Sequence, residues 1–418
     1  MPVTSPPPIT KPSVTPLPVV IDTDPGVDDA LALILALASP FINVVALTVT
    51  YGNVALPHTL RNLVSLLGLI QQWRREAGLP ELPKPFLAIG AERSLKAKTN
   101  GAEHIHGTDG FRGMHQKHPS LAPPHWDALL PKALQGLLSR SSSDIPIPDP
   151  ADLPYVPSSR TAAEELVYQA ISHPDDTLTL ITLGPFTDLA TAWSLNPEAI
   201  ARYSRVVSMA GAVNIPGNIS PYAEFNIWAD PEAARQIFEA TATPQGPQLR
   251  ELILIPLNVT EKVLLLLDHF EARIPSSSPL YIFLHDFLKD TICPSETLTS
   301  STMRIHDAVA VQYVIDLAQN HLASRGWVEL GTGQGLDLRV EAQDQWTSGM
   351  IITNQRAEGA RPPQNDDLIA QKTRGHTQVV GRVRAMKSVD PELYLDAILD
   401  GMNRILDDMY SISAAPDS

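Results

Sequence analysis

The sequence has a single cysteine, lacks long apolar runs and has fewer basic than acidic residues. Its one cysteine, Cys293, excludes an intramolecular disulfide framework and fits a reducing compartment. No apolar run reaches the roughly 18–20 residues of a membrane span, so we expect no membrane partner. With 31 Lys and Arg against 46 Asp and Glu residues, the net charge of −15 argues against a nucleic-acid partner. We therefore expect a cytoplasmic protein.

The amino terminus, MPVTSPPPITKPSVTPLP, is rich in proline and lacks the apolar stretch of a secretory signal. We interpret residues 1–17 as a disordered lead. Hydrophobic residues make up 44% of the chain, enough for a sizeable core, and we expect residues 18–412 to form a single domain. Within it, the Pro- and Ser-rich residues at about 118–160 predict a mostly irregular insertion, with one helix near 126–138.

The stretch DTDPGVDDA, residues 22–30, concentrates negative charge between two apolar segments. It holds the carboxylates of Asp22, Asp24, Asp28 and Asp29. The preceding Val-Val-Ile predicts a buried strand, the following apolar run predicts a buried helix, and Pro-Gly breaks the chain between them. Carboxylates this close repel one another, and a hard cation such as calcium or magnesium relieves the repulsion. Helix capping by an acidic residue is the alternative explanation.

Strand and helix patterns alternate along most of the chain. This alternation predicts an α/β fold with a mostly parallel central sheet and helices on both faces, Rossmann-like in layout. Ligands bind such sheets at the carboxyl ends of the strands, where Asp24, Asn53 and the loop of His106 would fall. The predicted strands cover 19–21, 43–50, 86–89, 177–183, 205–209 and 252–256, with shorter ones near 327–330, 337–340 and 378–384. The predicted helices cover 31–38, 57–72, 161–172, 281–289, 306–319 and 391–409.

Five motifs, in order from residue 19 to 318, resemble those of the inosine–uridine preferring nucleoside hydrolase family. DTDPGVDDA resembles the family's amino-terminal signature, and Tyr51-Gly52-Asn53 follows the second strand as the family's ribose-contacting Asn does. Gly184 matches the turn whose preceding carbonyl binds calcium. The segment AEFN at 223–226, followed by DPEA at 230–233, matches the ribose-binding segment, and His-Asp-Ala at 306–308 matches the last calcium motif.

The resemblance implies a hydrolase that cleaves the N-glycosidic bond of ribonucleosides to ribose and free base, as in nucleoside salvage. It implies Ca2+ as the cofactor, held by Asp24, Asp29, Asp307 and the carbonyl oxygen of Leu183. Calcium would lower the pKa of its bound water, and Asp24 is implied to be the general base as well as a ligand. The family forms dimers and tetramers, so we expect a homodimer or homotetramer. The preferred base stays open.

The resemblance also implies how a ribonucleoside is held. His306 matches the histidine that protonates the departing base, since imidazole titrates near neutrality, and His106 is the second candidate for base contact. The match at Met209 departs from the family by one residue in its distance to Asn218. The implied sugar contacts are Asp28 for the 2′-hydroxyl, Asn226 for the 3′-hydroxyl, Asn218 and Glu224 for the 5′-hydroxyl, and Asn53 and Met209 against the ribose.

Plain structural roles are the alternatives for single residues. Glu224 and Asn226 lie two apart in a strand-like run, as on a solvated edge strand. Asp307 would serve as a helix cap, His306 as a core or cap histidine and His106 as a loop residue. We assign His104, Asp109 and His115 to a surface loop and Trp228 to the core, and we leave Tyr281, His285, Phe287 and the polar linker up to residue 305 as possible base contacts.

Two other functions compete with nucleoside hydrolysis. A phosphohydrolase of the haloacid dehalogenase type would use Asp22 as nucleophile and Asp24 as acid, but Gly26 stands where that pattern wants Thr or Val. A ribose or nucleoside binder without catalysis would keep the calcium ligands and lose turnover. Release of ribose, release of phosphate, or binding without turnover separates the three.

Overall fold

The computed structural model describes residues 15–96, 101–124, 126–129, 149–242, 246–292, 302–331, 335–353 and 383–406. The main sheet consists of β1 (Leu17–Thr23), β2 (Ile42–Val49), β3 (Phe86–Ile89), β4 (Val156–Thr161), β5 (Thr179–Thr182), β6 (Arg205–Ser208), β7 (Leu252–Leu254), β10 (Val328–Glu329) and β13 (Val383–Ser388). Two small antiparallel pairs lie outside it, β8 (Leu264–Leu266) with β9 (Thr302–Arg304) and β11 (Leu338–Val340) with β12 (Ile351–Thr353).

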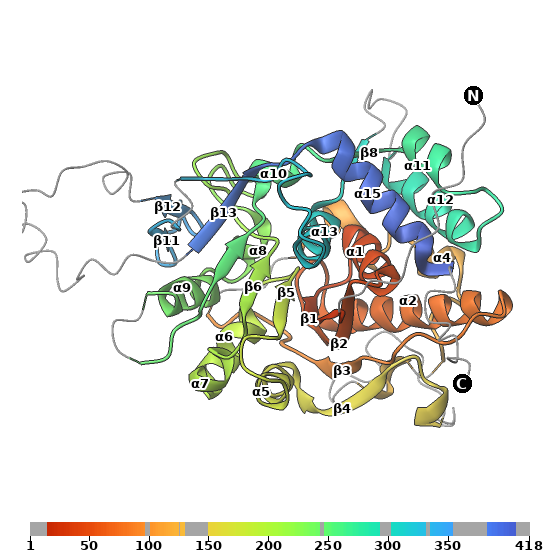
Figure 1. Cartoon of the computed structure of the whole chain (residues 1–418), viewed down its shortest axis with the longest axis horizontal. Helices are drawn as coiled ribbons and strands as arrows, with labels where there is room; N and C mark the ends of the chain where they lie inside the picture. The colour runs from red at the N-terminus through yellow and green to blue at the C-terminus, as the bar shows by residue number, and fades with distance from the viewer. Residues whose placement is uncertain are drawn as a thin grey trace, which may run out of the picture.

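The main sheet has nine strands in the order β10-β13-β7-β6-β5-β1-β2-β3-β4 (Figure 1). Neighbouring strands in it pair in parallel, except for the antiparallel pair of β10 and β13. The predicted α/β fold with a mostly parallel sheet is confirmed. β1 lies between β2 and β5, so the acidic stretch that follows it begins at the middle of the sheet.

Fourteen α-helices are described. The longer ones are α1 (Val27–Ala38), α2 (Leu56–Glu76), α5 (Ala162–Ser172), α6 (Thr187–Leu195), α9 (Pro231–Ala240), α12 (Pro279–Ile292), α13 (His306–Ala318) and α15 (Pro391–Asn403). The shorter ones are α3 (Glu103–His106), α4 (Met114–Lys117), α7 (Pro197–Ile200), α8 (Phe225–Ala229), α10 (Leu257–Thr260) and α11 (Leu267–Arg273). None of the described helices is long and apolar enough to cross a membrane.

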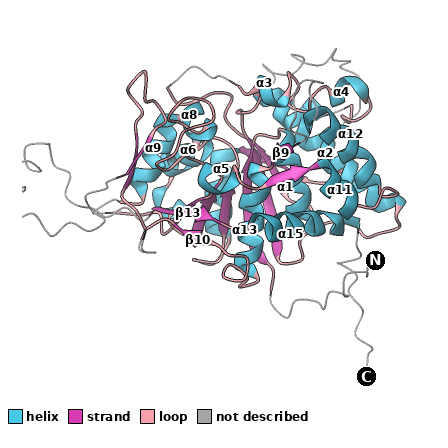
Figure 2. Ribbon diagram, turned by 90° about the horizontal axis from the view of Figure 1, so that it is seen from above, coloured by secondary structure: helices cyan, strands magenta, loops and turns pink. Residues whose placement is uncertain are grey.

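Side chains of β1 point alternately into two hydrophobic cores, one on each face of the sheet. Val19 and Ile21 join the core built with α1, α2, α13 and α15, whereas Val20 joins the core built with α5, α6 and α9. A strand buried on both faces must be apolar at every position, which explains the continuous Val-Val-Ile run. Figure 2 shows the strands enclosed between helices.

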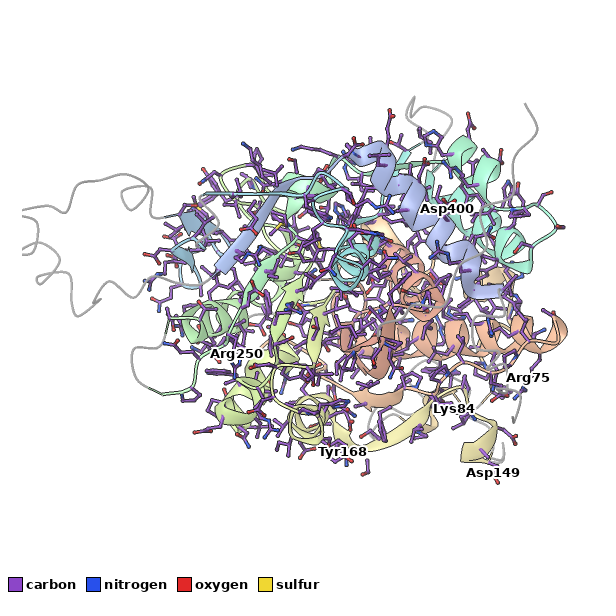
Figure 3. The ribbon with its side chains drawn as sticks, in the orientation of Figure 1. Arg75, Lys84, Asp149, Tyr168, Arg250 and Asp400 are labelled. Carbon is purple, nitrogen blue, oxygen red and sulfur yellow. The ribbon has the colours of Figure 1, made fainter. Side chains whose placement is uncertain are left out.

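Helix α1 is buried along its whole length, because α13 and α15 pack against it. A helix that is apolar on every side after its first turn belongs in a core. Its first turn holds Asp28 and Asp29, which suit the positive end of the helix dipole. The outer surface carries the charged side chains labelled in Figure 3, among them Arg75, Arg250 and Asp400. Their ion pairs are exposed and contribute little to stability.

The structure differs from the sequence-based expectation at several elements. Residues 156–160, which we assigned to the insertion, belong with Thr161 to the edge strand β4 beside β3. Pro157 is tolerated there because the outer side of an edge strand needs no donor. The helix expected near 126–138 appears as one 3₁₀ turn at Trp126–Leu129, and residues 130–138 lie outside the described ranges. The same holds for residues 1–14, Cys293 and the loop expected at 354–376.

Candidate active site

A cavity of about 530 Å³ lies at the carboxyl edge of the sheet. Asn53 follows β2, Leu183 follows β5 and Met209 follows β6, while Asp28 comes from the start of α1 after β1. Helix α13 and the loop after β3 complete the wall. The structure thus brings nearly all of the predicted substrate and metal residues to one cavity, whose lining includes Asp28, Asn53, His106, Leu183, Met209, Asn218, Glu224, Asn226, His306 and Asp307.

Three buried carboxylates at the base of this cavity lie close enough to share one ion. Oxygen atoms of Asp28, Asp29 and Asp307 fall within 4.8 Å of one another. This group includes Asp28, which we had assigned to the ribose, while Asp24 lies beside it. Burial, followed by the charges of Asp28, Asp29 and Asp24, raises the pKa of Asp307 well above its usual value. Like charges at this separation are stabilised by a cation.

Asp24 is 1% exposed and has one satisfied and one unsatisfied oxygen. Oδ2 accepts a hydrogen bond of 2.7 Å from the backbone N–H of Asn53. Oδ1 is buried and has no hydrogen-bond partner among the described residues. Burial and then the charge of Asp29 raise the pKa of Asp24 well above its usual value. An unpartnered carboxylate oxygen beside three clustered carboxylates fits a hard divalent cation, for which such oxygens are the preferred ligands.

Asp29 is held rigidly by its neighbours. Oδ1 accepts hydrogen bonds from the Thr23 hydroxyl at 2.6 Å and from the backbone N–H of Asp24. Oδ2 accepts from the backbone N–H of Gly26 and from Asn53 Nδ2, both at 2.9 Å. These four donors fix the carboxylate orientation, as outer-shell groups do around metal ligands. Asn53 thus braces the acidic turn as well as lining the cavity.

Two glycines let the backbone approach Asp24. A Cβ atom at Gly52 would lie 1.9 Å from Asp24 Oδ2, and one at Gly184 would lie 2.7 Å from Oδ1. Neither position has room for a side chain, because the carboxylate is enclosed between the ends of β1, β2 and β5. The close approach to Asp24 therefore explains why glycine stands at position 184, which matches the family, and also at position 52.

His106 is held in one tautomer. Its Nδ1 accepts a 3.1 Å hydrogen bond from the backbone N–H of Val27, so the neutral ring carries its proton on Nε2. Burial, then the charges of Arg112 and His306, lower the pKa of His106 to about 3. The ring is 7% exposed and lines the cavity, so it offers a neutral N–H donor there.

His306 stands at the start of α13, next to Asp307. Its Nδ1 lies 2.7 Å from the Thr260 hydroxyl. Burial and then the charge of Arg304 lower the pKa of His306 to about 4, which differs from the near-neutral titration that we expected of it. The difference arises because the imidazole is enclosed by the protein, which disfavours the charged ring.

The segment expected to bind ribose starts a helix rather than a strand. Glu224 is the N-cap of α8 and accepts from the backbone N–H groups of Asn226 at 2.7 Å, Gly211 at 2.8 Å and Ile227 at 3.2 Å. Burial raises the pKa of Glu224 to about 7, although these three hydrogen bonds act to lower it. The Glu224 carboxylate therefore fixes the start of α8 and also lines the cavity.

The two amides near Glu224 also bind the protein itself. Asn226 Nδ2 donates to the carbonyl oxygens of Leu183 at 2.6 Å and Met209 at 2.9 Å, which ties the ends of β5 and β6 together. Asn218 is exposed, and its Oδ1 accepts from the backbone N–H of Phe225 at 3.0 Å. Their roles toward ribose stay predictions.

Several supporting residues escaped the sequence analysis. Asp109 and His115, which we assigned to a surface loop, are buried and half-buried. Asp109 Oδ1 accepts from the backbone N–H groups of Phe111 and Gly113, which shapes the loop. Asn62 Nδ2 donates to the carbonyl oxygens of Pro25 and Asp109, so it joins the acidic turn to this loop. No local pattern signals Asn62, because its partners lie 37 and 47 residues away.

The aromatic residues that we left as possible base contacts pack elsewhere. Tyr281 stacks on Phe270 and His285 at centroid distances of 5.4 and 5.2 Å, and Phe287 meets Phe111 at 5.2 Å. None of Tyr281, His285 and Phe287 lines the cavity. The linker at 293–301 lies outside the described ranges.

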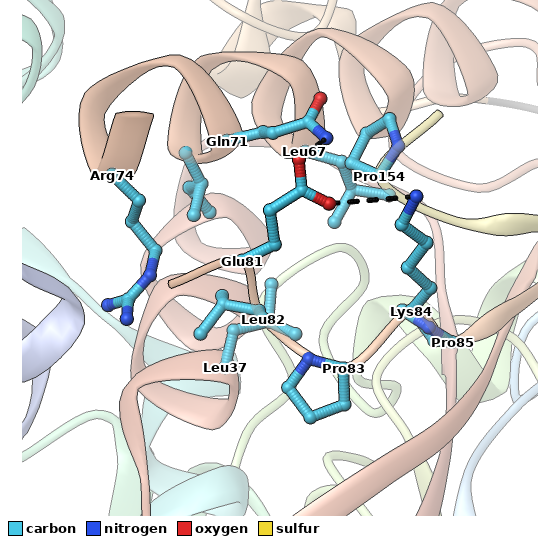
Figure 4. Close-up of a pocket in the computed structure, with 11 residues that line it drawn as sticks. Leu37, Leu67, Gln71, Arg74, Glu81, Leu82, Pro83, Lys84, Pro85 and Pro154 are labelled. Atoms are coloured by element: carbon cyan, nitrogen blue, oxygen red, sulfur yellow. Dashed lines mark hydrogen bonds and ion pairs between the residues drawn. The ribbon is translucent and has the colours of Figure 1, made fainter. Parts of the chain in front are cut away.

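A second hollow, between α2 and residues 81–85, is unrelated to this chemistry (Figure 4). Its volume is about 20 Å³, too small for more than a water molecule. The Glu81 carboxylate contacts Gln71 at 3.2 Å and Lys84 at 3.6 Å across this hollow.

The geometry does not support the alternative function of a phosphohydrolase. Its nucleophile would be Asp22, which is fully buried, accepts a hydrogen bond from the Thr48 hydroxyl and does not line the large cavity.

Comparison with known proteins identifies the family of the chain. The family model of the inosine-uridine preferring nucleoside hydrolases matches residues 19–396. The non-specific ribonucleoside hydrolase RihC of Klebsiella pneumoniae subsp. pneumoniae is 30% identical over 342 residues, 81% of this chain and 88% of that protein. The pyrimidine-specific ribonucleoside hydrolase RihA of Salmonella paratyphi A is 33% identical over 246 residues, 59% of this chain and 62% of that protein.

A solved plant nucleoside hydrolase, the PpNRh1 enzyme, has the same fold, with a TM-score of 0.66 and 23% identity over 93% of this chain and 99% of that chain. The chain belongs to the inosine-uridine preferring nucleoside hydrolase family. It is a ribonucleoside hydrolase, an enzyme that cleaves the N-glycosidic bond of nucleosides.

Proposed function

We propose that the enzyme releases the free base from ribonucleosides at a calcium site, with Asp24 as the general base toward the attacking water. The buried, unpartnered Oδ1 of Asp24 carries this proposal, because it lies beside the carboxylate cluster and is free to take a proton. Asp24, Asp29, Asp307 and the Leu183 carbonyl oxygen would hold the ion, with Asp28 near enough to join them. When bound, calcium keeps these carboxylates ionised and lowers the pKa of adjacent water.

The remaining residues hold the sugar as cleavage develops positive charge on it. Asp28 takes the 2′-hydroxyl, Asn226 the 3′-hydroxyl, and Asn218 and Glu224 the 5′-hydroxyl. Asn53 and Met209 close the ribose position. Carboxylates around an oxocarbenium-like sugar stabilise its charge, as in other glycoside hydrolases.

The departing base meets His306 and His106. Both rings are neutral in the protein at neutral pH, since their pKa values are about 4 and 3. His306 Nδ1 and the Thr260 hydroxyl lie 2.7 Å apart, and the neutral ring carries its proton on Nε2 when the hydroxyl is the donor of this hydrogen bond. We assign a base contact to His106 and proton delivery to His306, which must first take up a proton, because a neutral imidazole that gave up its N–H proton would become an imidazolate.

Other features of the enzyme follow from the family. We propose a cytoplasmic enzyme of nucleoside salvage that acts as a homodimer or homotetramer. We also propose that residues 18–412 form one domain, with the insertion now ending before β4.

The decisive experiment compares wild type with Asp24→Asn, which keeps the shape of the side chain and removes its basicity. Ribose release is measured by a reducing-sugar assay on inosine, uridine, adenosine and cytidine, with calcium occupancy determined for both proteins. We expect wild-type turnover and a kcat loss of at least about a hundredfold in the variant, the lower end for general base catalysis. A fully calcium-loaded variant within a few-fold of wild type would remove Asp24 from that role.

A further inference from the structure

Among the described residues, the guanidinium of Arg112 has no hydrogen-bond or ion-pair partner, and it brings a positive charge to a cavity wall that also holds four carboxylates. It lines the cavity, is half-buried, and its Nε is buried without a hydrogen-bond partner among the described residues. The other cavity arginine, Arg304, is exposed and pairs with Glu261. Because Nε is enclosed by the protein, a ligand in the cavity would meet the terminal nitrogens of the guanidinium, which also have no partner among the described residues, and an acceptor on the ligand would satisfy them.

The backbone holds Arg112 firmly in an unusual conformation. Its φ of 51° lies in the left-handed region, which a side chain other than glycine rarely adopts. Its N–H donates to the His106 carbonyl oxygen at 2.9 Å, and the N–H groups of the residues on either side, Phe111 and Gly113, both bind Asp109 Oδ1. Strained backbone fixed by its surroundings in this way is typical of ligand sites.

The charge of Arg112 also reaches His106. It is the second cause, after burial, of the lowered pKa of that ring. Both residues belong to the loop after β3 and both line the cavity, so this loop brings side chains with N–H donors to it. The acidic turn and α13 supply acceptors for the sugar and the metal, whereas this loop supplies donors. The base of a nucleoside is the part that has ring nitrogens and carbonyl oxygens to accept from them.

Given the proposed function, we propose that Arg112 binds the base and selects 6-oxopurine over 6-aminopurine nucleosides. A guanidinium has donors only, arranged as a fork that matches two adjacent acceptors. The O6 and N7 atoms of hypoxanthine and guanine form such a pair, and arginine reads guanine through them in DNA. Adenine places an amino donor beside N7, so one arm of the fork would face another donor.

The test measures kcat/KM for inosine and adenosine with the full-length, calcium-loaded enzyme. We expect wild type to favour inosine by at least about fivefold, the lower end for a bidentate contact. Arg112→Met should bring the ratio toward one, chiefly by losing activity on inosine, and Arg112→Lys should be intermediate because it keeps the charge without the fork. Arg75→Met, which changes an exposed, ion-paired arginine on α2 that does not line the cavity, is the control and should leave the ratio unchanged.

An unchanged ratio in Arg112→Met would overturn the assignment. If the variants are inactive on both nucleosides, calorimetric binding of free hypoxanthine and adenine decides, and equal hypoxanthine affinity in wild type and Arg112→Met overturns it. If wild type releases ribose from uridine or cytidine but from neither inosine nor adenosine, the proposed function stands and the assignment of Arg112 is overturned. If it releases ribose from none of the four, the proposed function fails by itself, while the hypoxanthine comparison still tests Arg112.

Discussion

Glu224 gives the enzyme a dependence of stability on pH that one substitution should remove. Burial raises the pKa of this carboxyl from 4.5 to about 7 in the folded protein. The folded state therefore binds the proton more tightly than the unfolded state, so the contribution of Glu224 to stability falls as pH rises from about 4.5 to 7. One pKa unit corresponds to about 1.4 kcal/mol, so the loss between about pH 5 and pH 8 is about 2–3 kcal/mol.

Urea unfolding of wild type and Glu224→Gln at both pH values, at equal free calcium, measures this loss. Glutamine does not titrate, so the free energy of unfolding of wild type should fall by about 2–3 kcal/mol more than that of the variant. Any loss of backbone hydrogen bonds in the variant is the same at both pH values and cancels.

Glu232→Gln is the matched control on α9. The hydrogen bond from Arg235 is the main reason that the pKa of Glu232 is lowered to about 2, so Glu232 is ionised throughout this range and its removal should add no slope. Parallel pH dependences of wild type and Glu224→Gln would mean that the three backbone donors keep Glu224 ionised despite its burial, and the reasoning would fail.

Three further substitutions test the metal site and the departure of the base. Asp307→Ala should weaken calcium binding, measured by calorimetry, and abolish ribose release; full activity of metal-stripped wild type in excess chelator would contradict a metal role. Gly52→Ala should cut kcat strongly while circular dichroism stays native, because its Cβ would lie 1.9 Å from Asp24 Oδ2; wild-type kcat would show that the turn can yield. His306→Ala should lower kcat for inosine much more than for p-nitrophenyl riboside, whose leaving group needs no proton; equal losses would make His306 a support for Asp307.

The alternation of strands and helices was predictable because each core strand is short, apolar and followed by a turn. β1 to β3 and β5 to β7 lie within a few residues of their predicted ranges. β4 was missed because its sequence, VPSSRT, is polar and contains proline, and an edge position with mostly exposed side chains imposes no apolar pattern. The β8–β9 pair was missed because its strands have three residues each.

The site residues that carry recognisable motifs were found, and those defined by tertiary contacts were not. Thr23 and Asn62 support the acidic turn through hydrogen bonds, and Asp109 shapes the loop that Asn62 joins to that turn. Their sequence neighbourhoods look like an ordinary strand end, helix and loop. Arg112 follows a glycine-rich loop whose left-handed φ values depend on those same contacts. The lowered pKa of His306 likewise depends on burial by distant segments, which a sequence does not reveal.

The proposed metal site needs residues that lie far apart in the chain, so it cannot be completed until late in synthesis. Asp29 leaves the ribosome 278 residues before Asp307, and at about 5–20 residues per second the wait is roughly 15–55 s. Helix α1 must also wait for α13 and α15, which cover it in the finished protein. The nascent chain thus exposes an apolar helix beside unneutralised carboxylates, and we expect chaperones to engage it there. Acquisition of calcium would then mark the completion of folding rather than its start.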